Sequence, residues 1–411
     1  MAKSLFISLL ILLSGLHINA QNTFSITGTV RDQKETLPGA GIYISGYKIA
    51  TQADNNGKFT IPNLKPGSYD ILVQMVGYLP YSKSLVISDK SLQVELVLKE
   101  NTVTLNEVVI RADPNRAKYI QQFKEYFIGT SPNAAQCKIL NPQVLNIDYD
   151  ITKSLLTVKT TEFLIVENKA LGYRLKYMLD YFEFNSRTRI IYFSGHPFFE
   201  ELKSTNARRK KYQQLREVAY YGSSQHFFKS LYSGSSQKEG FVINKMVKIP
   251  NPNRYPDSVI NKTLTRLRTL PKQSLAVRNP SKLDTSMISF WRKQQEMPRY
   301  IDHLDQREIL PDTLVHFFNK NLKYLSSKEA LAVIYTKERE PLVYGNTGFY
   351  IFRPLNIPDY EISVANIMQL PLRFYENGGV HDSRSLLYEG FWAYEKVADM
   401  VPMDYVPLKK L

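Results

Sequence analysis

Residues 24–30 read Phe24-Ser25-Ile26-Thr27-Gly28-Thr29-Val30, an alternation of apolar side chains with small or polar ones. The same alternation returns in residues 58–61, 69–75 and 92–98. Successive side chains of an extended chain point to opposite faces, so each stretch predicts a strand with one buried face. Short strands at this density within residues 24–98 are typical of a single β-sandwich.

Residues that reverse a chain at low cost separate the predicted strands. They occur as Leu37-Pro38-Gly39, Asp54-Asn55-Asn56-Gly57 and Lys65-Pro66-Gly67. Glycine tolerates positive φ and proline presets its own φ, so both residues favour turns. The segment 54–57 lacks the further acidic positions that a calcium loop needs, so we expect a turn there.

Five ordered blocks of this region carry a resemblance to a known domain. They are Gly28-Thr29-Val30-Arg31-Asp32, Leu37-Pro38-Gly39-Ala40, Asp54-Asn55-Asn56-Gly57-Lys58-Phe59, Leu64-Lys65-Pro66-Gly67-Ser68-Tyr69 and Gly77-Tyr78. Together they resemble the carboxypeptidase regulatory-like (transthyretin-like) domain that begins many exported Bacteroidota proteins. The resemblance implies a prealbumin-like all-β sandwich over residues 21–100, with a folding or docking role. Segments within 129–142, 167–173 and 220–227 resemble the C-terminal region of Bacteroidota proteins named only for this domain.

The sequence does not support the chemistry of a zinc carboxypeptidase. Such an enzyme supplies a histidine, a glutamate three residues later and a distant histidine, because zinc needs three convergent protein ligands. No histidine of this chain is followed by glutamate at that spacing. Phosphate-binding glycine loops, nucleophile elbows and dinucleotide fingerprints are also missing. We therefore expect no metal and no cofactor.

The first residues predict export. Lys3 supplies a positive charge, residues 5–13 are apolar apart from Ser8, and Ala20 precedes the polar Gln21. This pattern predicts a signal peptide over residues 1–20, cleaved after Ala20, and a place in the periplasm or at the outer membrane. No later apolar run has membrane-spanning length, so we expect no transmembrane segment after cleavage. Cys137 is the one cysteine, and we expect a buried thiol.

A short apolar segment follows the predicted sandwich. Residues 105–112, Leu105-Asn106-Glu107-Val108-Val109-Ile110-Arg111-Ala112, are similar to the segment that joins this module to the plug of TonB-dependent receptors. That similarity implies a possible TonB contact through strand pairing. A final sandwich strand or an ordered linker over residues 101–112 is the alternative, and we favour it because no plug and barrel follow.

The remaining residues, 113–411, predict a larger α+β region with mainly antiparallel sheets. Apolar residues at helical spacing predict a helix over 114–128, and residues 206–232 predict two helices divided at Gly222. Alternating stretches predict strands, with a hairpin turn at Asn185-Ser186-Arg187-Thr188. The predicted strands include 144–149, 155–158, 163–166, 173–184, 189–193, 330–335 and 347–352.

The net charge of +15 is concentrated in one part of the chain. Residues 200–299 hold 20 Lys and Arg side chains and seven Asp and Glu side chains, a net charge of +13. A local positive charge attracts lipid headgroups, acidic glycans or an acidic protein, and export makes nucleic acid a poor ligand. The candidate anion- or partner-binding residues are Arg208, Arg209, Lys210, Lys211, Arg216, Tyr220 and Tyr221.

Two other interpretations of this region stay open. The four consecutive cations could form a solvated helix face, with Tyr212, Leu215, Val218 and Ala219 turned inward. His226 is expected to be a packed or capping histidine rather than an acid or base.

Ser258 and Thr313 lie in Asp257-Ser258-Val259 and Asp312-Thr313-Leu314, which are similar to the O-glycosylation sequon of exported Bacteroidota proteins.

Three functions are consistent with the sequence. The first is a non-enzymatic envelope protein, in which the sandwich docks and the basic α+β region binds a protein or an anionic component. The second is a hydrolase of envelope glycan or peptide with its active site in residues 113–411. The third is an accessory linked to TonB at the outer membrane. A deep pocket with two acidic residues or a Ser/His pair would favour the enzyme.

Overall fold

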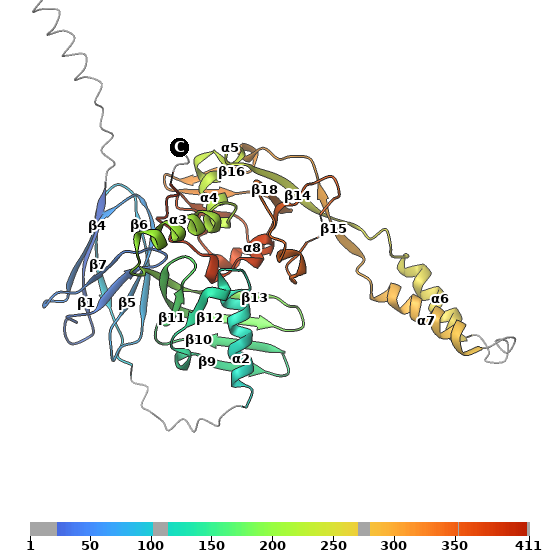
Figure 1. Cartoon of the computed structure of the whole chain (residues 1–411), viewed down its shortest axis with the longest axis horizontal. Helices are drawn as coiled ribbons and strands as arrows, with labels where there is room; N and C mark the ends of the chain where they lie inside the picture. The colour runs from blue at the N-terminus through green and yellow to red at the C-terminus, as the bar shows by residue number, and fades with distance from the viewer. Residues whose placement is uncertain (1–22, 102–113, 270–279, 352, 409–411) are drawn as a thin grey trace, which may run out of the picture.

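The computed structural model describes residues 23–101, 114–269, 280–351 and 353–408, without the side chains of 280–285 and 383. The predicted signal peptide at 1–20 lies outside these residues, and so does the strand-like segment 105–112. Figure 1 shows a β-sandwich at one side, an α+β region beside it and a helical hairpin that projects away from both.

Residues 24–97 form the predicted β-sandwich, which consists of two sheets. The strand order is β4-β1-β7 in one sheet and β3-β2-β5-β6 in the other. β1 pairs antiparallel with β4 and parallel with β7. The strands are β1 (Phe24–Arg31), β2 (Gly41–Ile44), β3 (Ala50–Gln52), β4 (Lys58–Leu64), β5 (Gly67–Gln74), β6 (Tyr81–Ile87) and β7 (Leu92–Val97).

The alternation in the sequence corresponds to the observed burial. Ile26 and Val30 of β1 are fully buried and pack with Ile42 and Ile71 of the other sheet. The segment 54–57 is the turn that its sequence predicts, because the Asp54 carboxylate accepts hydrogen bonds from the backbone N–H groups of Asn56 and Lys58. Period-two burial and turn residues therefore account for this sandwich.

A six-stranded antiparallel sheet and a helix build the first part of the α+β region. The strands run β8-β11-β12-β10-β9, and β13 pairs with β12. The helix α2 (Arg116–Phe123) continues as one π-helical turn, residues 124–128, so the predicted helix over 114–128 is confirmed. The strands are β8 (Cys137–Ile139), β9 (Asn146–Asp150), β10 (Leu155–Lys159), β11 (Leu164–Asn168), β12 (Tyr173–Asn185) and β13 (Ile191–Glu201).

Aromatic rings join α2 to this sheet. Phe123 and Phe127 are fully buried, and their rings contact Phe182 and Tyr177 of β12 at centroid distances of 5.1 and 5.0 Å. The predicted hairpin turn after β12 is confirmed, since Asn185 Oδ1 accepts hydrogen bonds from the backbone N–H groups of Arg187 and Thr188. Cys137 is buried as expected, and burial raises the pKa of its thiol to about 12.

The two helices predicted over 206–232 are present. They are α3 (Asn206–Tyr220) and α4 (Ser224–Ser233), followed by the short α5 (Ser236–Glu239). Gly222 separates α3 from α4 with a φ of 77°, a conformation that favours glycine. A Cβ at this position would approach the Glu361 carboxylate to 2.3 Å, so the division at Gly222 is also a point of close packing.

Two further sheets complete the α+β region. The larger runs β15-β14-β18-β19-β21 and the smaller runs β16-β17-β20. Phe227 and Phe228 of α4 pack into the core between them, and α8 (Phe391–Tyr394) adds Trp392. The strands are β14 (Phe241–Pro250), β15 (Tyr300–Asp305), β16 (Val315–Asn319), β17 (Leu322–Leu325), β18 (Ala330–Arg339), β19 (Tyr360–Ile367), β20 (Leu372–Tyr375) and β21 (Leu386–Gly390).

The strand predicted over 347–352 is wrong for the described residues 347–351. A 3₁₀ turn at Tyr344–Asn346 precedes them, and none of these five residues is in a strand. The Tyr344 side chain is fully buried and its hydroxyl donates a hydrogen bond to the carbonyl of Phe349. The segment therefore folds around the Tyr344 ring, which prevents an extended conformation.

β14 and β15 extend beyond the sheet as a two-stranded ribbon that carries the projecting hairpin (Figure 1). The hairpin consists of α6 (Asp257–Thr269) and α7 (Pro280–Glu296), and we call residues 251–269 and 280–299 the helical arm. Its base is closed by a hydrogen bond of 2.9 Å from the Asn251 N–H to the Arg299 carbonyl. The arm was not predicted from the sequence.

The sandwich is fixed to the α+β region by backbone and aromatic contacts. The Gly46 N–H donates to Pro197 and the Phe199 N–H donates to Tyr47, at 2.6 and 3.1 Å. The Tyr43 ring packs edge-on against Phe163 and Phe198 at 5.2 and 5.0 Å. The α+β region therefore covers β2 and the turn that follows it.

Residues near the end of the chain also join distant segments. Asp399 accepts hydrogen bonds of 2.9 Å from Ser131 and Asn133. The Ala398 carbonyl accepts one of 2.8 Å from Asn168, and the Met403 N–H donates one to Gly46. Residues 398–403 therefore connect the sandwich to the six-stranded sheet.

Candidate functional site

The basic segment predicted from the sequence begins α3. Thr205 caps the helix, since its side chain accepts a hydrogen bond from the Arg208 N–H. The four cations that follow are exposed, and none forms an ion pair with another described residue. They are Arg208, Arg209, Lys210 and Lys211. This cationic cluster is available to a ligand, and its role as a binding site stays a prediction.

Arg216 belongs to the same helix, but its side chain is buried and contacts other residues of the protein. It is 6% exposed, and its guanidinium lies 3.7 Å from the centre of the Tyr173 ring. It donates hydrogen bonds to the carbonyls of Leu171 and Gly172, at 2.7 and 3.2 Å. The structure therefore separates Arg216 from the cationic cluster and gives it a packing role.

The tyrosines at the end of α3 are also turned away from the cationic cluster. Tyr220 is buried in the core of the six-stranded sheet, and burial raises its pKa. Tyr221 is half-buried against the same core. Of the residues expected on the inner face of α3, Tyr212 and Ala219 are buried, but Val218 is 58% exposed. The helix therefore buries a narrower face than its sequence predicts.

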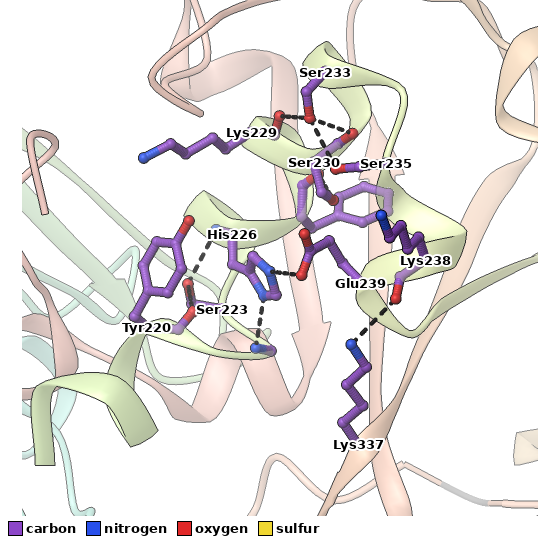
Figure 2. Close-up of polar contacts among 12 residues, drawn as sticks. Tyr220, Ser223, His226, Lys229, Ser230, Ser233, Ser235, Lys238, Glu239 and Lys337 are labelled. Carbon is purple, nitrogen blue, oxygen red and sulfur yellow. Dashed lines mark hydrogen bonds and ion pairs between the residues drawn. The ribbon is translucent and has the colours of Figure 1, made fainter. Parts of the chain in front are cut away.

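His226 is a packed histidine, as expected. It is 3% exposed, its Nδ1 accepts a hydrogen bond from the Gly222 N–H, and its Nε2 lies 3.7 Å from a Glu239 oxygen. Figure 2 shows this arrangement beside Tyr220 and Ser223. Burial, with smaller contributions from Lys337 and Lys229, lowers its pKa to about 4. The imidazole is therefore neutral near pH 7, with the proton on Nε2.

A buried carboxyl group lies on the other side of the Gly222 turn. Glu361 of β19 is 5% exposed, and its Oε2 has no hydrogen-bond partner among the described residues. Burial, with Glu338 and Glu340 nearby, raises its pKa well above the usual range. A carboxyl with a raised pKa keeps its proton and avoids the cost of a buried charge.

An open groove of about 960 Å³ lies between the sandwich and the six-stranded sheet. Sandwich residues, among them Tyr43 and Tyr78, form one wall. Lys176, Phe198 and Glu200 line the other, and Lys176 forms an ion pair of 2.5 Å with Glu200. Aromatic faces beside polar groups suit an extended polymer better than a small compact ligand.

The helical arm carries a second group of exposed cations. Lys262, Arg266, Arg268, Arg292 and Lys293 are exposed, and they form no ion pair with another described residue. Apolar residues at i, i+4 and i+7, namely Ile260, Leu264 and Leu267, could have revealed α6 from the sequence. The sequence predicted the positive charge of this region, but the two helices that carry it were not predicted.

Two more sequence hypotheses fall on described residues. Ser258, in the first turn of α6, and Thr313, beside β16, are both exposed. Exposure is a requirement for O-glycosylation, and modification of either residue stays a prediction. Among the described residues, no cluster of three or more His, Cys, Asp or Glu side chains could hold a metal ion. No helix in the described part of the chain is both long and apolar enough to cross a membrane.

Comparison with known families identifies the N-terminal part of the chain. Residues 26–110 match the family described as CarboxypepD_reg-like domain. This match agrees with the sandwich and with the resemblance carried by its turn motifs. The comparison with curated proteins found no match.

Solved structures share only small parts of the fold. The group B streptococcus pilus 2b backbone protein is 17% identical over 19% of this chain and 42% of its own, with a TM-score of 0.18. Catechol 1,2-dioxygenase from Acinetobacter is 9% identical over 21% and 55%, with a TM-score of 0.18. A putative carbohydrate binding protein from Bacteroides uniformis is 11% identical over 38% and 57%, with a TM-score of 0.17. This chain spans less than two thirds of each of them, and likeness at this level carries no argument about function.

Proposed function

We propose that this chain is a non-enzymatic binding protein of the cell envelope, whose cationic cluster on α3 holds an anionic envelope component. The ligand chemistry is a phosphate or carboxylate group displayed on a glycan or a lipid surface. The envelope location is part of the proposal and rests on the signal-peptide pattern of residues 1–20.

The observation that supports this function is the exposure of Arg208, Arg209, Lys210 and Lys211 in the first two turns of α3. Cations near a helix N-terminus are unfavourable, because that end of the helix carries a partial positive charge. A bound anion offsets both the helix dipole and the repulsion among the side chains. The cationic cluster therefore destabilises the free protein, and a bound anion removes this destabilisation.

The perturbed titratable groups support binding over hydrolysis. His226 and Glu361 have strongly shifted pKa values, but both side chains are buried. In the groove, the Glu200 carboxylate is paired with Lys176. A hydrolase needs an acid and a base that reach the substrate, whereas a binding protein needs exposed complementary charge.

The test uses two defined polyanions and a matched pair of variants. The mature protein is titrated with polygalacturonate, a soluble acidic glycan, and with vesicles that contain phosphatidylglycerol. The first variant changes the four cations of α3 to Gln. The control changes four exposed lysines of the sandwich to Gln: Lys58, Lys65, Lys90 and Lys99.

We expect the α3 variant to bind at least one of the two probes more than tenfold more weakly, while the control binds like the native protein. Each lost contact to a charged group costs about 1 kcal/mol or more, so four losses exceed this threshold. Equal binding by both variants would refute the proposal. It would also be refuted if the native protein bound neither polygalacturonate nor the vesicles. Binding to one probe alone identifies whether the anion comes from a glycan or a lipid.

A further inference from the structure

The helical arm has a composition and shape different from the rest of the α+β region. In sequence it holds eight Lys and Arg and three Asp and Glu side chains, a net charge of +5. α6 and α7 lie side by side and bury Ile260 and Leu264 between them. The arm projects from the ribbon of β14 and β15, away from the sandwich and the sheets (Figure 1).

One face of α7 carries exposed apolar side chains. Met287 is 44% exposed and Phe290 is 47% exposed, and Trp291 beside them is half-buried. Spacings of three and four residues place the three side chains on one face of the helix. Tyr255, 49% exposed, extends this surface, with its ring centre 5.1 Å from that of Trp291. Apolar and aromatic side chains thus form a continuous exposed patch.

A cation borders the apolar patch on the same helix. Lys293 lies roughly 60° around α7 from Phe290, whereas Arg292 points towards the opposite side of the helix. Arg299, also exposed, and Arg254 share the carboxylate of Asp257, at 2.7 and 2.5 Å. That shared carboxylate holds the base of the arm together, and the unpaired cations on α6 and α7 remain directed to solvent.

We propose that the helical arm docks on an anionic lipid surface, with Met287, Phe290 and Trp291 entering the headgroup region and the exposed cations of the arm contacting lipid phosphates. Tryptophan and tyrosine are favoured at membrane–water interfaces, and basic side chains beside an apolar helix face are typical of interfacial helices. A projecting hairpin with exposed apolar and basic side chains fits an extended charged surface. The inference rests on the proposed function in placing the protein at the envelope, and it uses a different surface.

The experiment measures partition of the mature protein to vesicles of pure phosphatidylcholine and to vesicles with an added fraction of phosphatidylglycerol. The chain has two tryptophans, and Trp392 is 5% exposed in the core. A blue shift in emission on vesicle addition therefore reports on Trp291. We expect binding only to the anionic vesicles, weaker binding at higher salt, and a blue shift that the Trp291→Phe variant lacks.

A charge variant of the arm and a matched control test the contact with lipid. The arm variant combines Lys262→Gln, Arg266→Gln and Lys293→Gln, and its control combines Lys58→Gln, Lys65→Gln and Lys90→Gln of the sandwich. Both remove three exposed charges. We expect the arm variant to bind anionic vesicles about 100-fold more weakly, since each basic residue near such a surface contributes about 1 kcal/mol. The control should keep the blue shift of Trp291.

A third variant, Met287→Ser with Phe290→Ser, keeps every charge of the arm and tests the apolar contact. We expect it to retain salt-sensitive binding but to lose the blue shift. Equal vesicle binding by the arm variant and its control would overturn the inference. Arm-dependent binding to polygalacturonate or to an envelope protein, without vesicle binding, would assign the arm a different partner. The α3 variant of the proposed function separates the two hypotheses, because its loss of polygalacturonate binding would support that function whatever the arm variant does.

Discussion

At the residue scale, cations of one helix have opposite roles. Arg208 ends in solvent, whereas Arg216 stacks on Tyr173 and donates to two backbone carbonyls. The planar guanidinium can stack and donate at the same time, which a lysine ammonium cannot do. Arg216 thereby ties α3 to the turn between β11 and β12.

Replacing Arg216 with lysine tests this role. Arg216→Lys keeps the charge but loses the stacking and one of the two carbonyl contacts, so we expect a loss of roughly 2 kcal/mol in the free energy of unfolding. Urea denaturation followed by circular dichroism measures it. Arg209→Lys, at an exposed position of the same helix, is the control and should change stability by less than about 0.5 kcal/mol. Similar stabilities for the two variants would argue against the packing role.

The buried His226 makes folding sensitive to acid. Its pKa is about 4 in the folded protein and near 6.5 when unfolded, so the unfolded chain binds the extra proton between these values. The stability associated with the neutral imidazole is present above pH 6.5 and is lost as the pH falls towards 4. The full effect is roughly 3 kcal/mol.

The variant His226→Asn keeps an acceptor for the Gly222 N–H but cannot be protonated. We expect it to be less stable at pH 7, because the ring contacts are lost, and to lose less further stability than the native protein between pH 7 and pH 4.5. Thermal unfolding at a series of pH values measures both effects. His303→Asn, at an exposed histidine, should follow the native pH profile. An unchanged profile in His226→Asn would exclude His226 as the source.

At the element scale, the sequence predicted those segments whose burial pattern has a simple period. β1 buries Ile26 and Val30 on one face and α2 repeats its apolar residues at helical spacing, so both were found. The strand predicted after Tyr344 is wrong because the chain folds around the buried Tyr344 ring, and this packing overrides the local strand preference. Arg208 and Arg216 could not be told apart for the same reason, since the stacking of Arg216 depends on Tyr173 of another element.

The contact between the sandwich and the six-stranded sheet is also testable at this scale. Tyr43→Ala removes the ring that packs against Phe163 and Phe198, and we expect a loss of about 2 kcal/mol in stability. Calorimetry should then resolve two unfolding transitions in place of one, because the two regions are less tightly coupled. Val86→Ala, at an exposed position of β6, serves as the control. A single unshifted transition in Tyr43→Ala would show that the aromatic contact does not couple the regions.

At the scale of the whole molecule, the positively charged arm lies outside the apolar cores that stabilise the fold. None of the described arm residues belongs to the apolar clusters that form the cores of the sandwich and the sheets. The arm therefore adds positive charge without supporting the rest of the fold. The sequence revealed the charge, but its division between α3 and the arm required the three-dimensional arrangement.

Removal of the arm tests its independence. Replacing residues 252–298 with Asn-Gly joins Asn251 to Arg299, which are already hydrogen-bonded, through a two-residue hairpin turn. We expect the melting temperature to change by less than about 4 °C, corresponding to roughly 1 kcal/mol for a protein of this size. Circular dichroism and thermal unfolding measure the result. A chain that no longer folds would show that the arm supports the sheets.

The contacts of residues 398–403 also constrain the order in which the chain assembles. Ser131 and Asn168 form hydrogen bonds with Asp399 and Ala398, which lie 268 and 230 positions further along the chain. All strand pairings of the sandwich lie within residues 24–97, so it can form before the later residues are made. The Gly46 carbonyl accepts its hydrogen bond from the Met403 N–H only afterwards. Synthesis from the N-terminus therefore delivers the residues that unite the two regions only after the sandwich and the six-stranded sheet have been made. Before residues 398–403 are in place, Ser131 and Asn168 lack these partners, and we expect the two regions to be cleaved by proteases more readily.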